Sequence, residues 1–379
     1  MSVGTLLVFT VWAPWGLAGH PPAVAAPPQH VLWTKQKPFP MPNQLIAPVG
    51  MRDLIVHRAG ADAYSFLHDS TIVAHRGILF ASWYNCPKQE IVDTSLIRGS
   101  RSTDGGVTWS DVEVIAQDPK RKIFYVPNVF LSHNQRLWTF ALRMTGHDLP
   151  TQLEAFRLDV TADRWEPMGL VADLFLPNCP PVKMSDGNFV MAGRVADRRG
   201  EQPLRPAVAV SQGDSILRSW NVVPLSAPGQ TFAFPETTVL VERGKLTAFF
   251  RSLKTVVLVS VSADCGRTWT PPAMSNFPVV DAKMFAGTLS TGQHYLISNT
   301  PGRAQGRDLL TIAVSEPGEA VFSRMWRIRD GYAAELKAGP QWSYPSAIEH
   351  DGKLYVVYTS EKHHCALSVI PLESLSAGE

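Results

Sequence analysis

Two short segments, STDGGVTW at residues 102–109 and SADCGRTW at residues 262–269, share the pattern S-x-D-x-G-x-T-W. In such a segment the aspartate can accept hydrogen bonds from the N–H groups of a turn, and the glycine tolerates a positive φ angle. The final tryptophan offers a large apolar ring that can pack between two sheets. The pattern therefore predicts the same tight turn between β-strands at two distant places in the chain.

Both turns belong to a longer repeat. Six segments share an extended run, a turn marked by glycine or its equivalent, and a second apolar run. The segments are residues 67–85, 126–144, 176–195, 234–252, 283–300 and 344–360. The turn markers are Gly77, Gln135, Gly187, Gly244, Gly292 and Gly352. They recur at intervals of 48 to 60 residues, which is typical of propeller blades with long loops, since four antiparallel strands need about 40 to 50 residues.

A third apolar strand follows each of the first five hairpins, and a tryptophan usually marks a fourth. The sixth unit ends after HCALSVIPL (364–372) and lacks a fourth strand, which residues 44–58 can supply. Closing the ring in this way removes exposed sheet edges. The sequence therefore predicts an all-β, six-bladed β-propeller with four antiparallel strands per blade, in one domain over residues 28–379. The alternative is a seven-bladed propeller with a further blade near residues 28–60.

The N-terminal region has the composition of an export signal. No Asp, Glu, Lys or Arg precedes Lys35, and residues 3–17 form an apolar run. This run is shorter than the ~20 helical residues that span a bilayer. Small residues at 23–25 (AVA) offer a cleavage site. We therefore expect residues 1–27 to be a signal peptide and the mature protein to be secreted or periplasmic, without a membrane span.

Composition excludes several kinds of partner. The formal net charge is only +2, so no charge excess marks the chain for nucleic acid or an anionic membrane. The four cysteines are scattered without a C-x-x-C pair, which argues against a structural zinc site. His363, His364 and Cys365 would alternate faces in a strand and so would not converge on one ion. We expect no metal and no cofactor.

Propeller topology indicates where chemistry would lie. The innermost strand of each blade begins at the mouth of the central channel, and the second strand ends there. The first strands bring His68, Asp69, Asn128, Asn178, Glu236, Lys283 and Tyr344 to this mouth. The second strands bring Asn85, Arg143, Arg194, Arg251 and Asn299. Because a guanidinium group binds a carboxylate through two hydrogen bonds, three arginines at equivalent positions predict an acidic sugar or another carboxylate as ligand.

The aspartate-centred turns and the repeat resemble the Asp boxes (BNR repeats) of the sialidase-like, six-bladed propeller superfamily, over about residues 65–370. In exo-sialidases a glutamate on an inner strand is followed by an arginine on the next, and Glu236 and Arg251 are similar. A further carboxylate-binding arginine resembles Arg307, and a tyrosine opening the last inner strand resembles Tyr344. The resemblance implies a retaining glycosidase acting on a terminal acidic sugar of a glycan, with Tyr344 as nucleophile, Glu236 as its base and both arginines on the carboxylate.

The sequence also departs from the sialidase pattern. Sialidases open blade 1 with Arg-Ile-Pro, whereas this chain has LHD at residues 67–69, so one arginine of the usual triad is absent. Arg52 and Arg194 are candidate replacements. The sialidase general acid, an aspartate in the loop before the first Asp box, has counterparts in Glu90 and Asp93.

His68 supports a second hypothesis. The superfamily includes exo-lyases and glycosidases that act at rhamnosyl-glucuronate ends of plant or algal glycans, and FLHDSTIVAHRGILFASWYN (66–85) resembles their first blade. A uronate lyase needs a base for the C5 proton and cations for the carboxylate, so His68 would be the base and Arg194, Arg251 or Lys283 the cations. A third hypothesis is a non-catalytic glycan-binding propeller, because this fold also serves as a binding module.

Overall fold

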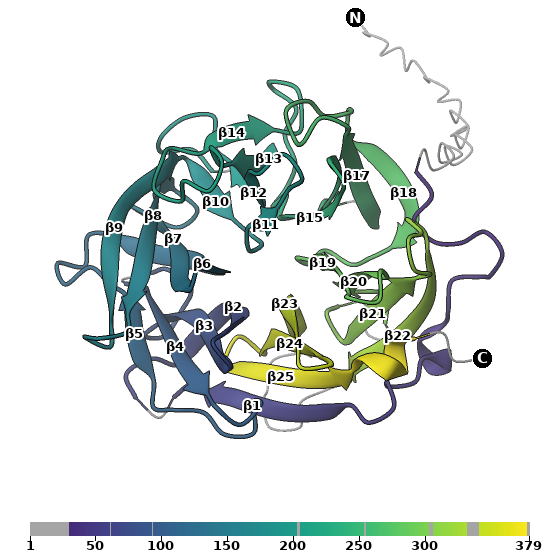
Figure 1. The fold of residues 1–379 in the computed structure, drawn as a ribbon, viewed down its shortest axis with the longest axis horizontal. Coiled ribbons are helices and arrows are strands. Elements are labelled where there is room, and N and C mark those ends of the chain that lie inside the picture. The colour runs from purple at the N-terminus through teal and green to yellow at the C-terminus, as the bar shows by residue number, and fades with distance from the viewer. Residues whose placement is uncertain are drawn as a thin grey trace, which may run out of the picture.

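The computed structural model describes residues 30–376, apart from residues 61, 93, 203–204, 254, 303–305 and 332–340. Across these described residues the strands form six antiparallel sheets arranged as blades around a central axis (Figure 1). The prediction of six blades is confirmed, and the alternative of a seventh is wrong. One apolar core cluster joins blades 1 to 3, and another joins blades 3 to 6.

The blades follow one another along the chain, and each is built from the channel outward. Blade 1 holds β2 (Phe66–His75), β3 (Ile78–Cys86), β4 (Leu96–Ser102) and β5 (Glu113–Ala116). Blade 2 holds β6 (Phe124–His133), β7 (Arg136–Met144), β8 (Pro150–Asp159) and β9 (Arg164–Asp173). Blade 3 holds β10 (Phe175–Pro177), β11 (Val182–Lys183), β12 (Phe189–Val195), β13 (Arg205–Val210) and β14 (Asn221–Pro224).

The second half repeats the plan. Blade 4 holds β15 (Thr237–Glu242), β16 (Lys245–Phe250), β17 (Val256–Ser262) and β18 (Ala273–Pro278). Blade 5 holds β19 (Phe285–Thr288), β20 (His294–Asn299), β21 (Leu309–Ser315) and β22 (Phe322–Asp330). Blade 6 holds β23 (Trp342–His350), β24 (Lys353–Ser360), β25 (His364–Pro371) and, outermost, β1 (Arg52–Arg58). Two short 3-10 helices, η1 (Pro42–Gln44) and η2 (Leu372–Leu375), flank the strands.

The turns of the inner hairpins explain why the blade repeat can be recognised in the sequence. Five of them turn through a glycine with a positive φ angle. In blade 2, Asn134 and Gln135 adopt φ angles of 50° and 59°, so the same turn forms without glycine. Blade 3 differs from the expected single first strand, because Pro180 and Pro181 lack the N–H groups that a continuous ladder needs. The strand is split into β10 and β11, which both pair with β12.

The two Asp boxes are structural turns at the face opposite the channel mouth. Asp104 accepts hydrogen bonds from the Thr108 hydroxyl (2.6 Å), the Thr108 N–H (2.9 Å) and the Ser102 hydroxyl (2.8 Å). These bonds, those from Thr108 first, lower the pKa of Asp104 to about 2. Asp264 makes the same set of bonds. A Cβ atom on Gly106 would lie 2.7 Å from a leucine of β25, so the first box packs tightly against blade 6.

Blade 6 combines an early strand of the chain with its last three strands. Strand β1 pairs antiparallel with β25, so an N-terminal and a C-terminal segment share one sheet (Figure 1). Residues 1–27, where we expect an export signal, lie outside the described residues. Within the described residues, no helix has the length and apolar character needed to cross a bilayer.

Candidate active site

A cavity of about 200 Å³ lies where the inner strands begin and the second strands end; we call it the mouth pocket. Its lining includes His68, Asp69, Glu90, Glu236 and Tyr344. Arg194, Arg251 and Arg307 also line it. Residues from all six blades or the loops beside them therefore converge on one site, and a pocket of this size suits one sugar residue rather than a stretch of polymer.

Irregular backbone re-aims side chains into the mouth pocket. The register of β2 shifts between His68 and Thr71, and that of β23 shifts between Ser343 and Ser346. Tyr344 lies in the second shift with a φ angle of 60°, in the left-handed region that tyrosine rarely adopts. Strained backbone of this kind is typical of functional sites, where the surrounding structure must hold it in place.

The half-buried Tyr344 and the buried Glu236 and Arg251 form a hydrogen-bonded cluster. The Tyr344 hydroxyl donates to Glu236 Oε1 over 2.7 Å. Arg251 Nη1 lies 3.0 and 3.1 Å from the two carboxylate oxygens of Glu236 and 3.2 Å from the Tyr344 hydroxyl. Burial, and then the negative charge of Glu236, raise the pKa of Tyr344 well above its usual value, whereas Arg251, Arg307 and Arg194 act in the opposite direction. The phenol is therefore neutral at rest and already hydrogen-bonded to a base.

The arginines are held by a small number of acidic and carbonyl groups. Arg251 Nε pairs with Asp281, and Arg307 donates to the Asp281 carbonyl oxygen from Nη2 over 3.0 Å. The Arg307 guanidinium also lies 5.4 Å from the centre of the Tyr344 ring. Arg194 Nη2 lies 3.5 Å from Asp148, while its buried Nε has no hydrogen-bond partner among the described residues. Arg194 therefore keeps a buried, unsatisfied donor beside the pocket, which is costly unless another group supplies an acceptor.

His68 and Asp69 are buried residues that line the pocket. The His68 ring lies 4.1 Å from that of Tyr344, and its buried Nδ1 has no partner within the described chain. Burial, followed by the charge of nearby lysines and arginines, lowers the pKa of His68 well below its usual value, so the imidazole is neutral at pH 7. Burial raises the pKa of Asp69 despite its ion pair with Lys283.

Glu90 is the described counterpart of the expected general acid. Its Oε1 accepts the Tyr84 hydroxyl over 2.7 Å, and its Oε2 pairs with Lys362 over 2.7 Å. Although burial acts to raise its pKa, Lys362 and Tyr84 outweigh burial and the pKa of Glu90 falls below its usual value. Glu90 is therefore ionised at neutral pH and suits a charge-stabilising role better than proton donation. Asp93, the other candidate, lies outside the described residues.

A family model described as the BNR repeat-like domain matches residues 77–356 of the chain. The chain belongs to this family. In structure it is similar to the Hadza microbial sialidase Hz136, with a TM-score of 0.68 and 19% identity over 85% of this chain and 69% of that chain. It is also similar to Trypanosoma rangeli sialidase in complex with 2,3-difluorosialic acid (covalent intermediate), with a TM-score of 0.65 and 15% identity over 87% and 60% of the respective chains.

Two further comparisons give no information about the reaction that this BNR repeat-like protein carries out. A protein of unknown function from Dyadobacter fermentans DSM 18053 is similar at a TM-score of 0.65 and 15% identity, over 85% of this chain and 99% of that chain. No curated protein matches the sequence. Identities this low show a shared sialidase-like fold, and the reaction has to be inferred from the residues of the mouth pocket.

Several predicted site residues of the BNR repeat-like chain lie elsewhere. Arg52 lies on the exposed outermost strand β1 and cannot replace the missing sialidase arginine, whereas Arg194 lines the pocket. Arg143 Nε lies 3.9 Å from Glu154 Oε2, and Arg143 is not among the described residues that line the pocket. Lys283 is not among the described residues that line the pocket, and its buried Nζ pairs with Asp69. Asn85, Asn128, Asn178 and Asn299 bond to protein groups, and Asn299 holds the carbonyl oxygen of Trp342 (2.7 Å), just before Tyr344.

Sequence reasoning missed four pocket-side residues of this BNR repeat-like chain because they lie in loops outside the repeat. They are His147, Asp148, Asp281 and Lys362. The only feature of the sequence that could have indicated them is their place in the repeat, because each lies in a loop that joins strands at the channel mouth.

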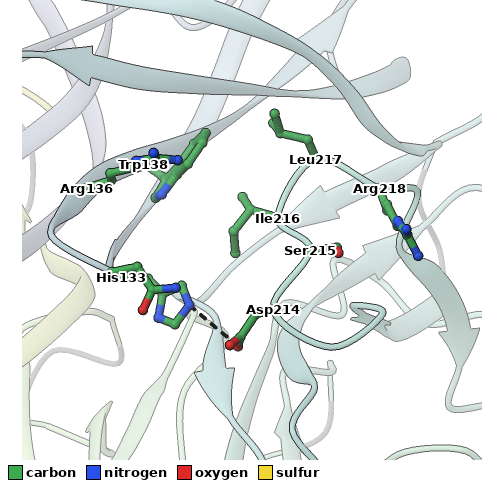
Figure 2. A pocket seen from close by; sticks show the side chains of 9 residues that line it. His133, Arg136, Trp138, Asp214, Ser215, Ile216, Leu217 and Arg218 are labelled. Carbon is green, nitrogen blue, oxygen red and sulfur yellow. Dashed lines mark ion pairs between the residues drawn. The ribbon is translucent and has the colours of Figure 1, made fainter.

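A second hollow, of about 350 Å³, lies on the opposite face between blades 2 and 3. Figure 2 shows His133 facing Asp214, with Nε2 and Oδ1 3.5 Å apart, beneath Trp138 and Ile216. Among the described residues, neither a tyrosine nor a glutamate lines it. The mouth pocket is therefore the better candidate active site.

Proposed function

We propose that the protein is an exo-acting, retaining glycoside hydrolase that removes a terminal carboxylate-bearing sugar from a glycan. The observation that carries this proposal is the 2.7 Å hydrogen bond from the Tyr344 hydroxyl to Glu236, inside a buried pocket flanked by Arg251 and Arg307. A tyrosine paired with a carboxylate base is the arrangement that activates a phenol as a nucleophile. The small volume of the pocket favours action at a chain end.

The nucleophile suits a sugar whose anomeric carbon carries a carboxylate. An aspartate or glutamate nucleophile would be repelled by that carboxylate, whereas a phenol approaches it as a neutral group. As the Tyr344 oxygen bonds to the anomeric carbon, its proton passes to Glu236. The glycosidic C–O bond breaks with its electron pair going to the leaving oxygen, which takes up a proton from an acid in the pocket. Water then attacks the same carbon and gives a proton back to that group, while the bond to tyrosine breaks and Glu236 returns the proton to Tyr344.

Three guanidinium groups are positioned to hold the substrate carboxylate. Arg251 and Arg307 lie beside the tyrosine, and the buried Arg194 has an unsatisfied Nε donor. Bidentate arginine–carboxylate pairs fix orientation as well as supplying energy. We assign Arg194 the place of the arginine that the sialidase pattern has in blade 1, because it lines the same pocket. The sialidases among the structural neighbours support sialic acid as the first substrate to test.

The first test is turnover of a fluorogenic sialoside by the wild-type protein, Tyr344→Phe and His68→Ala. The proposal expects wild-type turnover, loss of it in Tyr344→Phe, and its survival in His68→Ala. Tyr344→Phe keeps the ring and its packing against His68, so it removes the hydroxyl with little effect on the fold. Full turnover by Tyr344→Phe would exclude a tyrosine nucleophile.

A second candidate, a lyase acting on a rhamnosyl-glucuronate end, rests on His68. This imidazole is buried, neutral and without a partner on Nδ1 among the described residues, so it can accept a proton. A lyase would generate the ultraviolet absorbance of an unsaturated uronate from a rhamnosyl-glucuronate-capped glycan, and His68→Ala would abolish it. Binding of either glycan without turnover would instead support a non-catalytic glycan-binding propeller.

A further inference from the structure

The mouth pocket contains a nucleophile and its base, but hydrolysis also needs a group that gives a proton to the departing oxygen. Glu90 has both carboxylate oxygens engaged and is held ionised. His68 is neutral and buried beside the nucleophile. Asp69 is buried in an ion pair with Lys283. None of these three groups offers a proton at the rim of the pocket, where the leaving group must depart.

His147 lies at that rim, in the short loop between β7 and β8. Its side chain lines the pocket and is 49% exposed, whereas Glu236 is buried and Tyr344 is half-buried. The loop is closed by two backbone hydrogen bonds, Thr145 N–H to the Leu149 carbonyl (3.2 Å) and Leu149 N–H to the Gly146 carbonyl (3.1 Å). A leaving group bound toward solvent would therefore pass His147.

Asp148 orients this imidazole. Its Oδ2 lies 3.2 Å from His147 Nδ1, and its Oδ1 lies 3.5 Å from Arg194 Nη2. The Asp148 side chain is only 9% exposed, and its φ angle of 53° places it in the left-handed region. An imidazole whose Nδ1 lies beside a buried carboxylate presents Nε2 as the nitrogen that exchanges a proton with substrate. His147 Nε2 has no partner within the described part of the chain.

We propose that His147 is the catalytic acid and base of the mouth pocket and that Asp148 is its positioning residue. This inference rests on the proposed glycosidase function. In the first step Tyr344 bonds to the anomeric carbon, the glycosidic C–O bond breaks with its electron pair going to the oxygen, and that oxygen takes the proton from His147 Nε2. In the second step His147 Nε2 accepts a proton from water, whose oxygen displaces Tyr344.

Arg194 connects the His147–Asp148 pair to the proposed binding site for the substrate carboxylate. The guanidinium that we assign to the substrate carboxylate also contacts Asp148, which in turn holds His147. Glu90, from the loop between β3 and β4, lines the same pocket as His147 and Asp148.

The test compares two sialosides that differ only in the leaving group. A 4-nitrophenyl sialoside releases a stable phenolate and needs little protonation, whereas methyl sialoside releases methoxide and needs an acid. We expect His147→Asn to reduce kcat/KM for methyl sialoside about 10²- to 10⁴-fold, the range for loss of a general acid. We expect a loss of less than about tenfold for the nitrophenyl sialoside in its glycosylation step, because little proton transfer is needed.

Glu90→Gln is the matched control, because it changes the neighbouring carboxylate at the same rim. It should affect both sialosides to a similar degree. Equal losses on both substrates in His147→Asn, or no loss on either, would overturn the inference and leave the glycosidase standing if Tyr344→Phe is still inactive. A leaving-group-selective loss in Glu90→Gln alone would move the acid to Glu90. Absence of wild-type turnover on both sialosides would remove the proposed function and this inference together.

Discussion

Replacing Glu236 by glutamine tests the base within the Tyr344 cluster. The substitution keeps the shape of the side chain and an oxygen that can accept hydrogen bonds, but it removes the charge that receives the phenolic proton. Loss of a general base typically costs about 10²- to 10⁴-fold in rate. In free energy of activation this is about 3 to 5 kcal/mol. We therefore expect Glu236→Gln to reduce kcat by that factor on the fluorogenic sialoside.

The fold should tolerate this change. Arg251 remains paired with Asp281, so the loss of charge on Glu236 does not leave an isolated buried cation. We expect the free energy of unfolding to fall by about 1.5 to 3 kcal/mol, the range for hydrogen bonds to charged groups. Because the charge of Glu236 contributes to the raised pKa of Tyr344, the variant should also titrate this tyrosine at lower pH, which ultraviolet difference titration can detect. Wild-type kcat in a folded Glu236→Gln protein would refute the assignment of the base.

Three further substitutions address the frame of the site. Asp104→Ala should lower the melting temperature but leave kcat/KM unchanged. In the wild-type protein, the contribution of Asp104 to the free energy of unfolding should be lost as pH drops from about 4 toward 2, because its pKa is depressed in the folded state. Lys283→Met leaves Asp69 buried and unpaired, so we expect a loss of about 3 to 5 kcal/mol at neutral pH; calorimetry should show part of it regained on acidification, since burial raises the pKa of Asp69. Gly106→Ala should destabilise more than Gly77→Ala in urea unfolding: both have positive φ, but only a Cβ on Gly106 meets a neighbouring blade, 2.7 Å from a leucine.

The blade repeat could be predicted because each blade carries its own local signals. Turn glycines recur at one place in five hairpins, and the two Asp boxes recur at another. Propeller topology then brings the starts of the inner strands together, which is why Glu236 and Tyr344 could be expected in one pocket although 108 residues separate them. This argument needs only strand order, and strand order follows from the repeat.

The remaining parts of the site depend on structure that has no periodic signal. The backbone irregularities that turn Asp69 and Tyr344 into the pocket are local and leave no mark in the hydrophobic pattern. The pairing of His147 with Asp148 depends on a loop whose conformation is set by its own hydrogen bonds. Arg52 was a wrong candidate for the missing arginine because its strand closes the outside of blade 6, far from the channel.

The most direct measurement for tyrosine-nucleophile chemistry is mass spectrometry of the protein after reaction with a fluorinated sialic acid that slows the second step. We expect a covalent sugar adduct on the peptide that contains Tyr344, and none in Tyr344→Phe. Turnover of the sialoside together with an adduct on another side chain would contradict the assignment of Tyr344 as the nucleophile.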